Sequence, residues 1–243
     1  MNRYFISDLH LDESTTHITS LFRSFVEKLK KNNEQTELYI LGDLFESWIG
    51  DDYKNELHDK VKITLKSLSE SGIKVFFLYG NRDFLIGEKF LSETDVQLLI
   101  DPFLLKGNGK TILLTHGDQM CVDDVEYQTF RSIVRNPDWQ KDFLNYPISK
   151  RLKIAGETKD ASKESKQEKS MDIMDVNEEE VIRVFKKYKV NTMIHGHTHR
   201  PMKHELKIDG RECSRYVLGD WNKTTAMVLQ WNSDSLELID LIN

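Results

Sequence analysis

The sequence predicts an α/β fold in which two β-sheets stack face to face and helices cover the outside. Two observations support this fold class. Short apolar runs alternate with helical patterns over the first half of the chain, and a strand-rich segment follows near its end. The 243 residues are enough to bury a sizeable core, and we expect one domain over 1–243.

The strands of the first half are short runs of β-branched, aromatic or aliphatic residues, which are typical of buried strands. A turn signal, Asn108-Gly109, separates two further runs at 103–106 and 110–114 and predicts a hairpin. The other runs expected to form strands are 4–7, 38–41, 75–79 and 112–115.

Helical periodicity appears between these strands. One helix should follow the first strand, with an apolar face made by Ile18, Leu21, Phe22, Phe25, Val26 and Leu29. A second helix should begin near Asn55 and end at Gly72, because glycine readily adopts the left-handed conformation that closes a helix.

The second half begins with a segment that lacks strand signals. Residues 123–170 should be helical, with a break at Asn136-Pro137. Asn177 and Glu180 resemble a capping box that opens a helix ending at Tyr188. The strands expected after this helix are 192–195, 202–207, 214–218, 226–231 and 236–241.

Composition excludes several classes of protein. The formal net charge of −6 provides no general attraction for nucleic acid, so an anionic substrate must be held by local cations. Two cysteines, Cys121 and Cys213, cannot form a disulfide framework, which favours a cytoplasmic protein. No apolar run approaches the roughly 20 residues that span a bilayer, and Asp8 comes too early for a signal peptide.

Polar residues with metal-binding chemistry follow five of the predicted strands, and the ends of strands are where an α/β fold gathers its site. Since residues two apart on an extended chain share a face, Asp8 with His10 and His197 with His199 should each present two ligands together. The candidate ligands are Asp8, His10, Asp43, Asn81, His116, His197 and His199.

Imidazole and oxygen ligands without thiolate suit Mn, Fe or Zn. Seven ligands are too many for one ion and suit two, with Asp43 as the natural bridging carboxylate. Two divalent ions outweigh the charges of Asp8 and Asp43, so the site should attract a phosphate group and activate water. Each motif alone has an ordinary alternative, such as a polar strand end or a helix cap, but five together favour the metal site.

These motifs resemble the calcineurin-like metallophosphoesterases over nearly the whole chain. The resemblance implies a four-layer α/β/β/α sandwich and excludes His195 as a ligand, although it alternates with the other two histidines. Many relatives have Gly-Asn-His-Glu where Arg82 and Asp83 follow Asn81, so a histidine that protonates the leaving group is absent. The resemblance assigns one ion to Asp8, His10, Asp43 and His199, and the other to Asp43, Asn81, His116 and His197.

Segments 7–11, 41–52, 80–84, 173–177 and 195–201 resemble one branch of this family, the UDP-2,3-diacylglucosamine diphosphatases of lipid A biosynthesis. The resemblance implies two Mn²⁺ per chain and hydrolysis, by metal-activated water, to UMP and 2,3-diacylglucosamine 1-phosphate. It also implies a helical lid over 123–170 and a cytoplasmic monomer attached peripherally to the inner membrane. It matches substrate-binding positions to Asn81, Arg82, Asp124, Ser162, Lys166, Lys169 and His197.

Arg82 and the charged residues of the lid segment offer independent support. Arg82 could grip a second phosphate with its guanidinium, or pair with Asp83 at the surface. On a helix over 156–170, four lysines and a serine share an arc of about 120°, with acidic residues opposite. Such a face could bind an anion or simply be solvated. The arc contains Lys159, Ser162, Lys163, Lys166 and Lys169, and the opposite side Glu157, Asp160, Glu164 and Glu168.

The apolar residues of the same segment leave two interpretations open, because helical stripes of this kind line an acyl pocket or form ordinary core. They are Tyr127, Phe130, Ile133, Trp139, Phe143, Leu144 and Tyr146. One rival function is another two-metal phosphodiesterase or phosphatase acting on nucleotides, which would not need an apolar lid. A metal-free scaffold is the other rival, and such proteins are expected to lose ligand residues, of which none is missing here.

Overall fold

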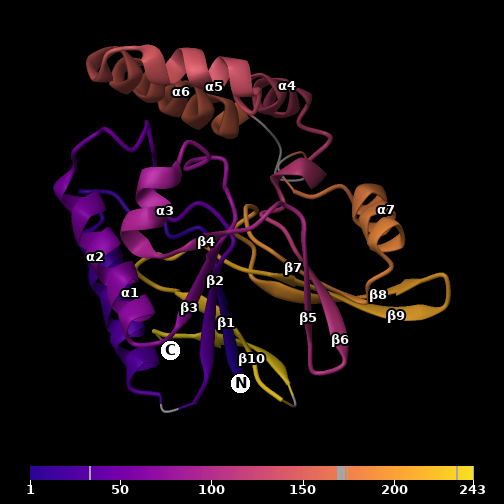
Figure 1. The fold of residues 1–243 in the computed structure, drawn as a ribbon. Helices are drawn as coiled ribbons and strands as arrows, with labels where there is room; N and C mark the ends of the chain where they lie inside the picture. The colour runs from indigo at the N-terminus through magenta and orange to yellow at the C-terminus, as the bar shows by residue number, and fades with distance from the viewer. Residues whose placement is uncertain (33, 169–172, 174, 234, 243) are drawn as a thin grey trace.

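The computed structural model describes residues 1–32, 34–168, 173, 175–233 and 235–242, and within them two β-sheets (Figure 1). The strand order of the first sheet is β11 (Leu236–Asp240), β10 (Met227–Trp231), β1 (Asn2–Ile6), β2 (Thr36–Ile40), β3 (Lys74–Phe77), β4 (Gln97–Leu98). That of the second sheet is β5 (Phe103–Gly107), β6 (Lys110–Leu114), β7 (Thr192–His195), β9 (Arg211–Val217), β8 (Met202–Ile208).

The strands that precede the candidate ligands run parallel. β1 pairs with β2, and β2 with β3, in parallel register, while β6 and β7 form a parallel pair in the second sheet. The antiparallel strands β10 and β5 lie beside these parallel groups. Because parallel neighbours end at the same edge of a sheet, the loops after β1, β2 and β3 meet at one edge, as do those after β6 and β7.

Three clusters of buried side chains define four layers. Helices α1 (Thr16–Lys30), α2 (Glu56–Glu70) and α3 (Glu88–Thr94) share one cluster with the first sheet. The two sheets share a second, which includes Phe5, Leu114 and Tyr216. Helix α7 (Glu178–Tyr188) shares the third with the second sheet. The order helix, sheet, sheet, helix confirms the predicted α/β/β/α sandwich.

Local sequence signals account for most element boundaries. The Asn55 side chain accepts a hydrogen bond from the His58 backbone N–H at 3.1 Å, and Gly72 follows α2 with a φ of +85°. Asn108 and Gly109 both have positive φ in the hairpin between β5 and β6. Apolar periodicity does not mark the shortest elements, among them α3, β4 and the 3₁₀ turn at Asp118–Met120.

The segment that lacks strand signals forms α4 (Val125–Val134), α5 (Pro137–Asn145) and α6 (Ile148–Glu168). The break at Asn136-Pro137 is confirmed, because Asn136 caps α5 by accepting from the Asp138 backbone N–H at 2.8 Å. In Figure 1 these helices form a layer of their own beyond the loops that end the strands. Within the described residues, no helix is long and apolar enough to cross a membrane.

Arg151 fastens α6 to the rest of the protein. Its side chain is only 2% exposed and forms an ion pair with Asp52. It also donates to the carbonyls of Ile49 at 2.6 Å and Tyr146 at 3.0 Å. A buried guanidinium must keep such partners because an unpaired charge is costly inside a protein. Arg151 therefore fixes the helix against the loop at 49–52.

His58 makes the stability of this fold depend on pH. Its ring is buried against Trp48, with ring centroids 4.4 Å apart, and burial lowers its pKa to about 4. The unfolded chain binds a proton near pH 6.5, so it takes up more protons than the folded protein between pH 6.5 and 4. Stability therefore falls as the pH drops through this window.

We expect the unfolding free energy of the metal-depleted wild type to fall when the pH is lowered from 7 to 5. The fall should be about 1–2 kcal/mol larger than in a metal-depleted His58→Phe variant. Phenylalanine keeps an aromatic ring among Phe45, Trp48 and Tyr53 but cannot take up a proton. Urea unfolding of both proteins at the two pH values measures the difference. Equal losses in the two proteins would show that His58 is not the responsible group.

Candidate metal centre

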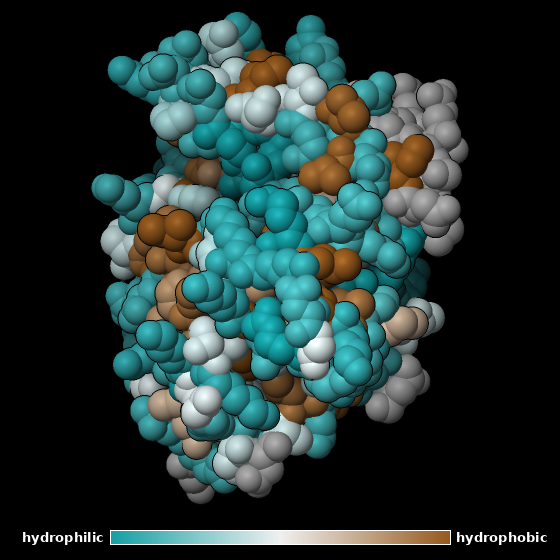
Figure 2. Space-filling model, turned by 90° about the vertical axis from the view of Figure 1, so that its right-hand side faces the viewer, coloured by the Kyte–Doolittle hydropathy of each residue, from teal (hydrophilic) through white to brown (hydrophobic). Residues whose placement is uncertain are grey.

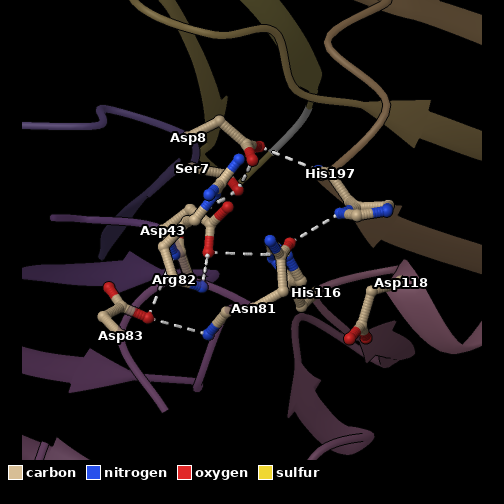
Figure 3. Close-up of polar contacts among 12 residues, drawn as sticks. Ser7, Asp8, Asp43, Asn81, Arg82, Asp83, His116, Asp118 and His197 are labelled. Carbon is tan, nitrogen blue, oxygen red and sulfur yellow. Dashed lines mark hydrogen bonds and ion pairs between the residues drawn. The ribbon is translucent and has the colours of Figure 1, made fainter. Parts of the chain in front are cut away.

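All seven predicted ligands converge at the ends of five strands, and Figure 3 shows most of them around one centre. Asp8 and His10 follow β1, Asp43 follows β2, and Asn81 follows β3. His116 follows β6, and His197 and His199 follow β7. The first sheet therefore supplies four of the side chains and the second sheet three.

Asp8, His10 and His199 form one side of the centre, with one potential ligand atom each within 4.8 Å of the others. Asp8 Oδ1 lies 3.4 Å from His199 Nε2 and 3.8 Å from His10 Nε2. The other carboxylate oxygen, Oδ2, accepts from Ser7 Oγ at 2.6 Å and from the His197 backbone N–H at 2.9 Å. Asp8 is thus held by one oxygen while the other faces the two imidazoles.

Asn81, His116 and His197 form the other side. Asn81 Oδ1 lies 3.0 Å from His116 Nε2 and 2.9 Å from His197 Nδ1. The remaining ring nitrogen of His116, Nδ1, lies 2.8 Å from the Leu41 carbonyl. That contact suits donation by Nδ1, which would leave Nε2 as the lone-pair nitrogen turned to the centre.

Asp43 lies between the two sides. Its Oδ2 is 3.7 Å from His10 Nε2, and its Oδ1 is 3.8 Å from His116 Nε2. Oδ1 also accepts from the Arg82 backbone N–H at 2.8 Å. The two oxygens of one buried carboxylate therefore address the two groups of candidate ligands separately, which is the geometry that a bridging ligand needs.

The backbone of five candidate ligands is left-handed. Asp8, His10, Asp43, His197 and His199 have φ between +47° and +70°. The prediction that these residues lie on extended chain was therefore wrong. The predicted pairs, Asp8 with His10 and His197 with His199, do reach the centre. β1 ends at Ile6 and β7 at His195, so these ligands lie on the loops that follow the strands.

The electrostatics of the centre favour positive charge. Burial acts to lower the pKa of His116, yet the carboxylates of Asp43, Asp118 and Asp8 raise it to about 9. Burial acts to raise the pKa of Asp8, yet His199 and the other imidazoles hold it well below its usual range. His197 behaves oppositely, because burial and the neighbouring His116 lower its pKa to about 3.

These residues fit divalent ions. Among the described residues, buried Asp8 Oδ1 has no hydrogen-bond partner, and it faces the imidazole nitrogens of His10 and His199. Buried carboxylate oxygens rarely lack a partner, and a bound cation accounts for one that does. Histidine nitrogens with carboxylate and amide oxygens suit Mn, Fe or Zn. His195 is outside the set, since its ring nitrogens contact the Gly196 carbonyl and Arg215.

Asp83 holds together the loops that carry Asp43 and Asn81, a role that no sequence motif indicated. It is fully buried and accepts from the backbone N–H groups of Gly80, Asp43, Leu44 and Phe45. The suggested surface pair between Arg82 and Asp83 is therefore wrong. Burial and the Asp43 carboxylate raise the pKa of Asp83, to about 7, but all four hydrogen-bond partners are donors that suit the ionised carboxylate.

Asp118 joins helix α4 to the end of β6. Its buried carboxylate accepts from Arg131 Nε and from the Tyr127 hydroxyl, both at 2.7 Å. Arg135, one turn further along α4, donates to the Gly80 carbonyl at 2.8 Å. Sequence motifs showed Asp118 after His116, but its partners are helix residues that only the fold brings near.

The predicted substrate-binding residues have mixed positions. Arg82 is half-buried beside the centre, and Asp124 caps α4 by accepting from the Tyr127 backbone N–H at 3.1 Å. Ser162 is half-buried on α6. Lys166 belongs to α6, but its side chain is outside the described part of the structure, and Lys169 lies wholly outside it.

Glu46 links a candidate ligand to helix α6. Its Oε2 lies 3.0 Å from His10 Nδ1, and its Oε1 lies 3.1 Å from Lys159 Nζ. Burial acts to raise the pKa of Glu46, but the contact with His10 and the charge of Arg82 lower it to about 2. A carboxylate on the far nitrogen of a ligating histidine orients the ring and raises its basicity.

We expect Glu46→Gln to weaken Mn²⁺ binding by about tenfold or more, because it removes the charge that orients His10. Calorimetric titration of the metal-depleted protein with Mn²⁺ measures this effect. Lys159→Ala is the matched control, since it removes the other partner of Glu46 and should leave the affinity within about twofold. Unchanged affinity in Glu46→Gln would show that Glu46 does not support His10.

Comparisons with known proteins agree with this geometry. The family model of calcineurin-like phosphoesterases matches residues 1–201. A UDP-2,3-diacylglucosamine hydrolase of Vibrio parahaemolyticus is 46% identical over 98% of this chain and 97% of its own length. One of Haemophilus influenzae is 47% identical over 93% of both chains.

A solved structure of an archaeal phosphodiesterase has a TM-score of 0.51 at 13% identity, covering 99% of this chain and 100% of its own, which shows a shared fold alone. The family model and the full-length relatives carry the assignment. The chain therefore belongs to the calcineurin-like phosphoesterase family and, within it, to the family of UDP-2,3-diacylglucosamine hydrolases.

Proposed function

We propose that this protein hydrolyses the diphosphate of UDP-2,3-diacylglucosamine, releasing UMP and 2,3-diacylglucosamine 1-phosphate in lipid A biosynthesis. The observation that carries the chemistry is the complete ligand set with Asp43 at its middle, its two oxygens directed to the two groups. The substrate class comes from relatives that are named UDP-2,3-diacylglucosamine hydrolase and match the chain along nearly its whole length.

The proposed resident ions are two Mn²⁺. Asp8, His10, Asp43 and His199 would hold one, and Asp43, Asn81, His116 and His197 the other. When bound, such ions supply positive charge that lowers the pKa of water and stabilises charge developing on phosphate oxygens. The ligand types support this proposal equally for Mn and for Fe or Zn, so the identity of the ion rests on the resemblance.

Residues around the centre would bind and orient the diphosphate. We assign this role to Arg82, because its backbone N–H donates to Asp43 and its charge acts on Glu46 beside His10. A guanidinium can grip phosphate oxygens with two parallel hydrogen bonds. No histidine follows Asn81 to protonate the leaving group, and a phosphate leaving group needs little protonation.

Helices α4, α5 and α6 would act as a lid over the substrate, as proposed for 123–170. Lys159, a member of the predicted lysine face, contacts Glu46 beside His10, which supports an orientation of that face toward the centre. Ser162 lies on the same helix. Lys166 and Lys169 would extend this face along the chain and bind the anionic substrate.

Apolar residues of these helices divide into two groups. Phe143 is buried and stacks on Trp139 with ring centroids 5.0 Å apart, so these two belong to the core. Phe130, Ile133, Leu144 and Tyr146 are exposed, and Figure 2 shows apolar residues at the surface of this upper layer. The exposed group would contact acyl chains and the cytoplasmic face of the inner membrane. The protein would act there as a monomer.

A two-substrate assay tests the function. The protein, loaded with Mn²⁺, is offered UDP-2,3-diacylglucosamine in detergent and, separately, a small chromogenic phosphodiester. We expect a kcat/KM for the lipid nucleotide at least about a hundredfold higher, because only that substrate engages the lid and the phosphate-binding residues. UMP must appear among the products of the lipid nucleotide. Equal kcat/KM values for the two substrates would favour a general phosphodiesterase of the same fold.

A further inference from the structure

A cavity of about 330 Å³ lies at the second sheet, beside the loop that carries two of the candidate ligands. Its lining comes from the loop after β7 and from strands β8 and β9. Thr198 and Arg200 of this lining flank the candidate ligand His199 in sequence, so the cavity lies beside the loop that carries His197 and His199. The lining includes Asp175, Thr198, Arg200, Met202, His204 and Arg215.

The lining combines apolar walls with hydrogen-bonding groups. Met202 lines one side and is 55% exposed, while Asp175 and Arg200 form an ion pair on another. Arg215 donates to His195 through Nη1 at 3.0 Å, but its Nε and the Thr198 hydroxyl have no hydrogen-bond partner within the described residues. Binding sites for small organic molecules show this mixture of apolar surface and a few polar groups.

The proposed substrate has two chemically different halves on either side of the reacting diphosphate. Helices α4–α6 carry the exposed apolar side chains and reach the centre through Lys159 and Glu46, near His10. The described lining of the cavity comes instead from the loop after β7 and from β8 and β9, with Asp175, and includes no residue of α4–α6. The nucleoside has a planar base with an imide group and a ribose with hydroxyl groups. These groups match the mixed lining of the cavity, and acyl chains do not.

We propose that this cavity receives the nucleoside half of the substrate, a proposal that rests on the proposed function. The volume is in the range of small-molecule sites, which begin at about 300 Å³. The base lies against Met202, and the side chains of Thr198, Arg200 and Arg215 supply hydrogen bonds to the base or ribose. The diphosphate then extends from the cavity across the metal centre toward α4–α6.

UMP, the product that contains this half, is the probe. Inhibition of lipid-nucleotide hydrolysis by UMP is measured for the wild type, for Met202→Trp, which fills the cavity, and for His204→Ala, which removes a polar wall. We expect the inhibition constant to rise about tenfold in Met202→Trp and severalfold in His204→Ala. Inhibition by inorganic phosphate and hydrolysis of the small chromogenic phosphodiester should stay within about twofold.

Lys203→Ala is the matched control. Lys203 lies between Met202 and His204 on β8. Successive residues of a strand face opposite sides, so UMP should inhibit this variant as strongly as it inhibits the wild type. Unchanged UMP inhibition in both cavity variants would overturn the proposal, and so would an equal loss toward UMP and the chromogenic substrate. Failure of the proposed function is separate, because the wild type would then not hydrolyse the lipid nucleotide at all.

Discussion

Asp43→Ala should reduce turnover of UDP-2,3-diacylglucosamine by about three orders of magnitude or more. The substitution removes the carboxylate whose oxygens lie 3.7 Å from His10 Nε2 and 3.8 Å from His116 Nε2, between the two groups of candidate ligands. Both ions would lose a ligand at once, and the mutual repulsion of the ions would lose its screening. The measurement is kcat with Mn²⁺ in excess, together with bound metal per chain by elemental analysis.

The control for this experiment is Asp59→Ala, which removes an exposed carboxylate whose partner is Lys62. It should leave both activity and metal content unchanged, since surface ion pairs contribute little. Metal content in Asp43→Ala should fall from the proposed two ions per chain to one or none. If that variant kept a tenth of the normal rate, Asp43 could not be a bridging ligand.

Asp83→Asn should lower the unfolding free energy by about 2–4 kcal/mol and reduce activity with it. The amide has nearly the shape of the carboxylate but only one accepting oxygen. Its NH₂ group would face backbone N–H groups that now donate to Asp83, such as that of Leu44 at 2.7 Å. Donors would meet donors in a fully buried place, and the loops carrying Asp43 and Asn81 would move apart.

Urea unfolding of the metal-depleted protein measures this loss without the contribution of bound ions. Asp95→Asn is a suitable comparison, because Asp95 is exposed and pairs with Lys66 at the surface. It should change stability by less than about 0.5 kcal/mol. Wild-type stability in Asp83→Asn would mean that the four backbone donors do not depend on a charged acceptor.

Much of the fold was predictable because local signals and burial agree. The periodic residues of α1 are buried except Leu21, which is half-buried, and Asn55 and Asn177 cap the helices that they were expected to open. Short parallel strands in the interior appear in sequence as short apolar runs. The polar residue after each run then stands out as a candidate ligand.

The supporting residues were not predictable in the same way. Glu46, Asp83 and Asp118 act on partners that the fold brings near, such as Lys159 for Glu46 and Arg131 for Asp118. No periodicity or spacing marks such pairs in a single sequence. The conformation of the ligand loops was mistaken for a similar reason, since an extended chain and a left-handed turn can each bring alternate side chains to one edge.

The left-handed backbone at Asp8, His10, Asp43, His197 and His199 has a consequence for engineering. Each such residue costs roughly 1 kcal/mol relative to glycine, which adopts this conformation freely. The crowding of like-charged and desolvated groups adds to that cost when no ion is bound. A screen that selected only for heat resistance of the metal-free protein would therefore favour glycine at these positions, and it would discard the candidate metal ligands in the process.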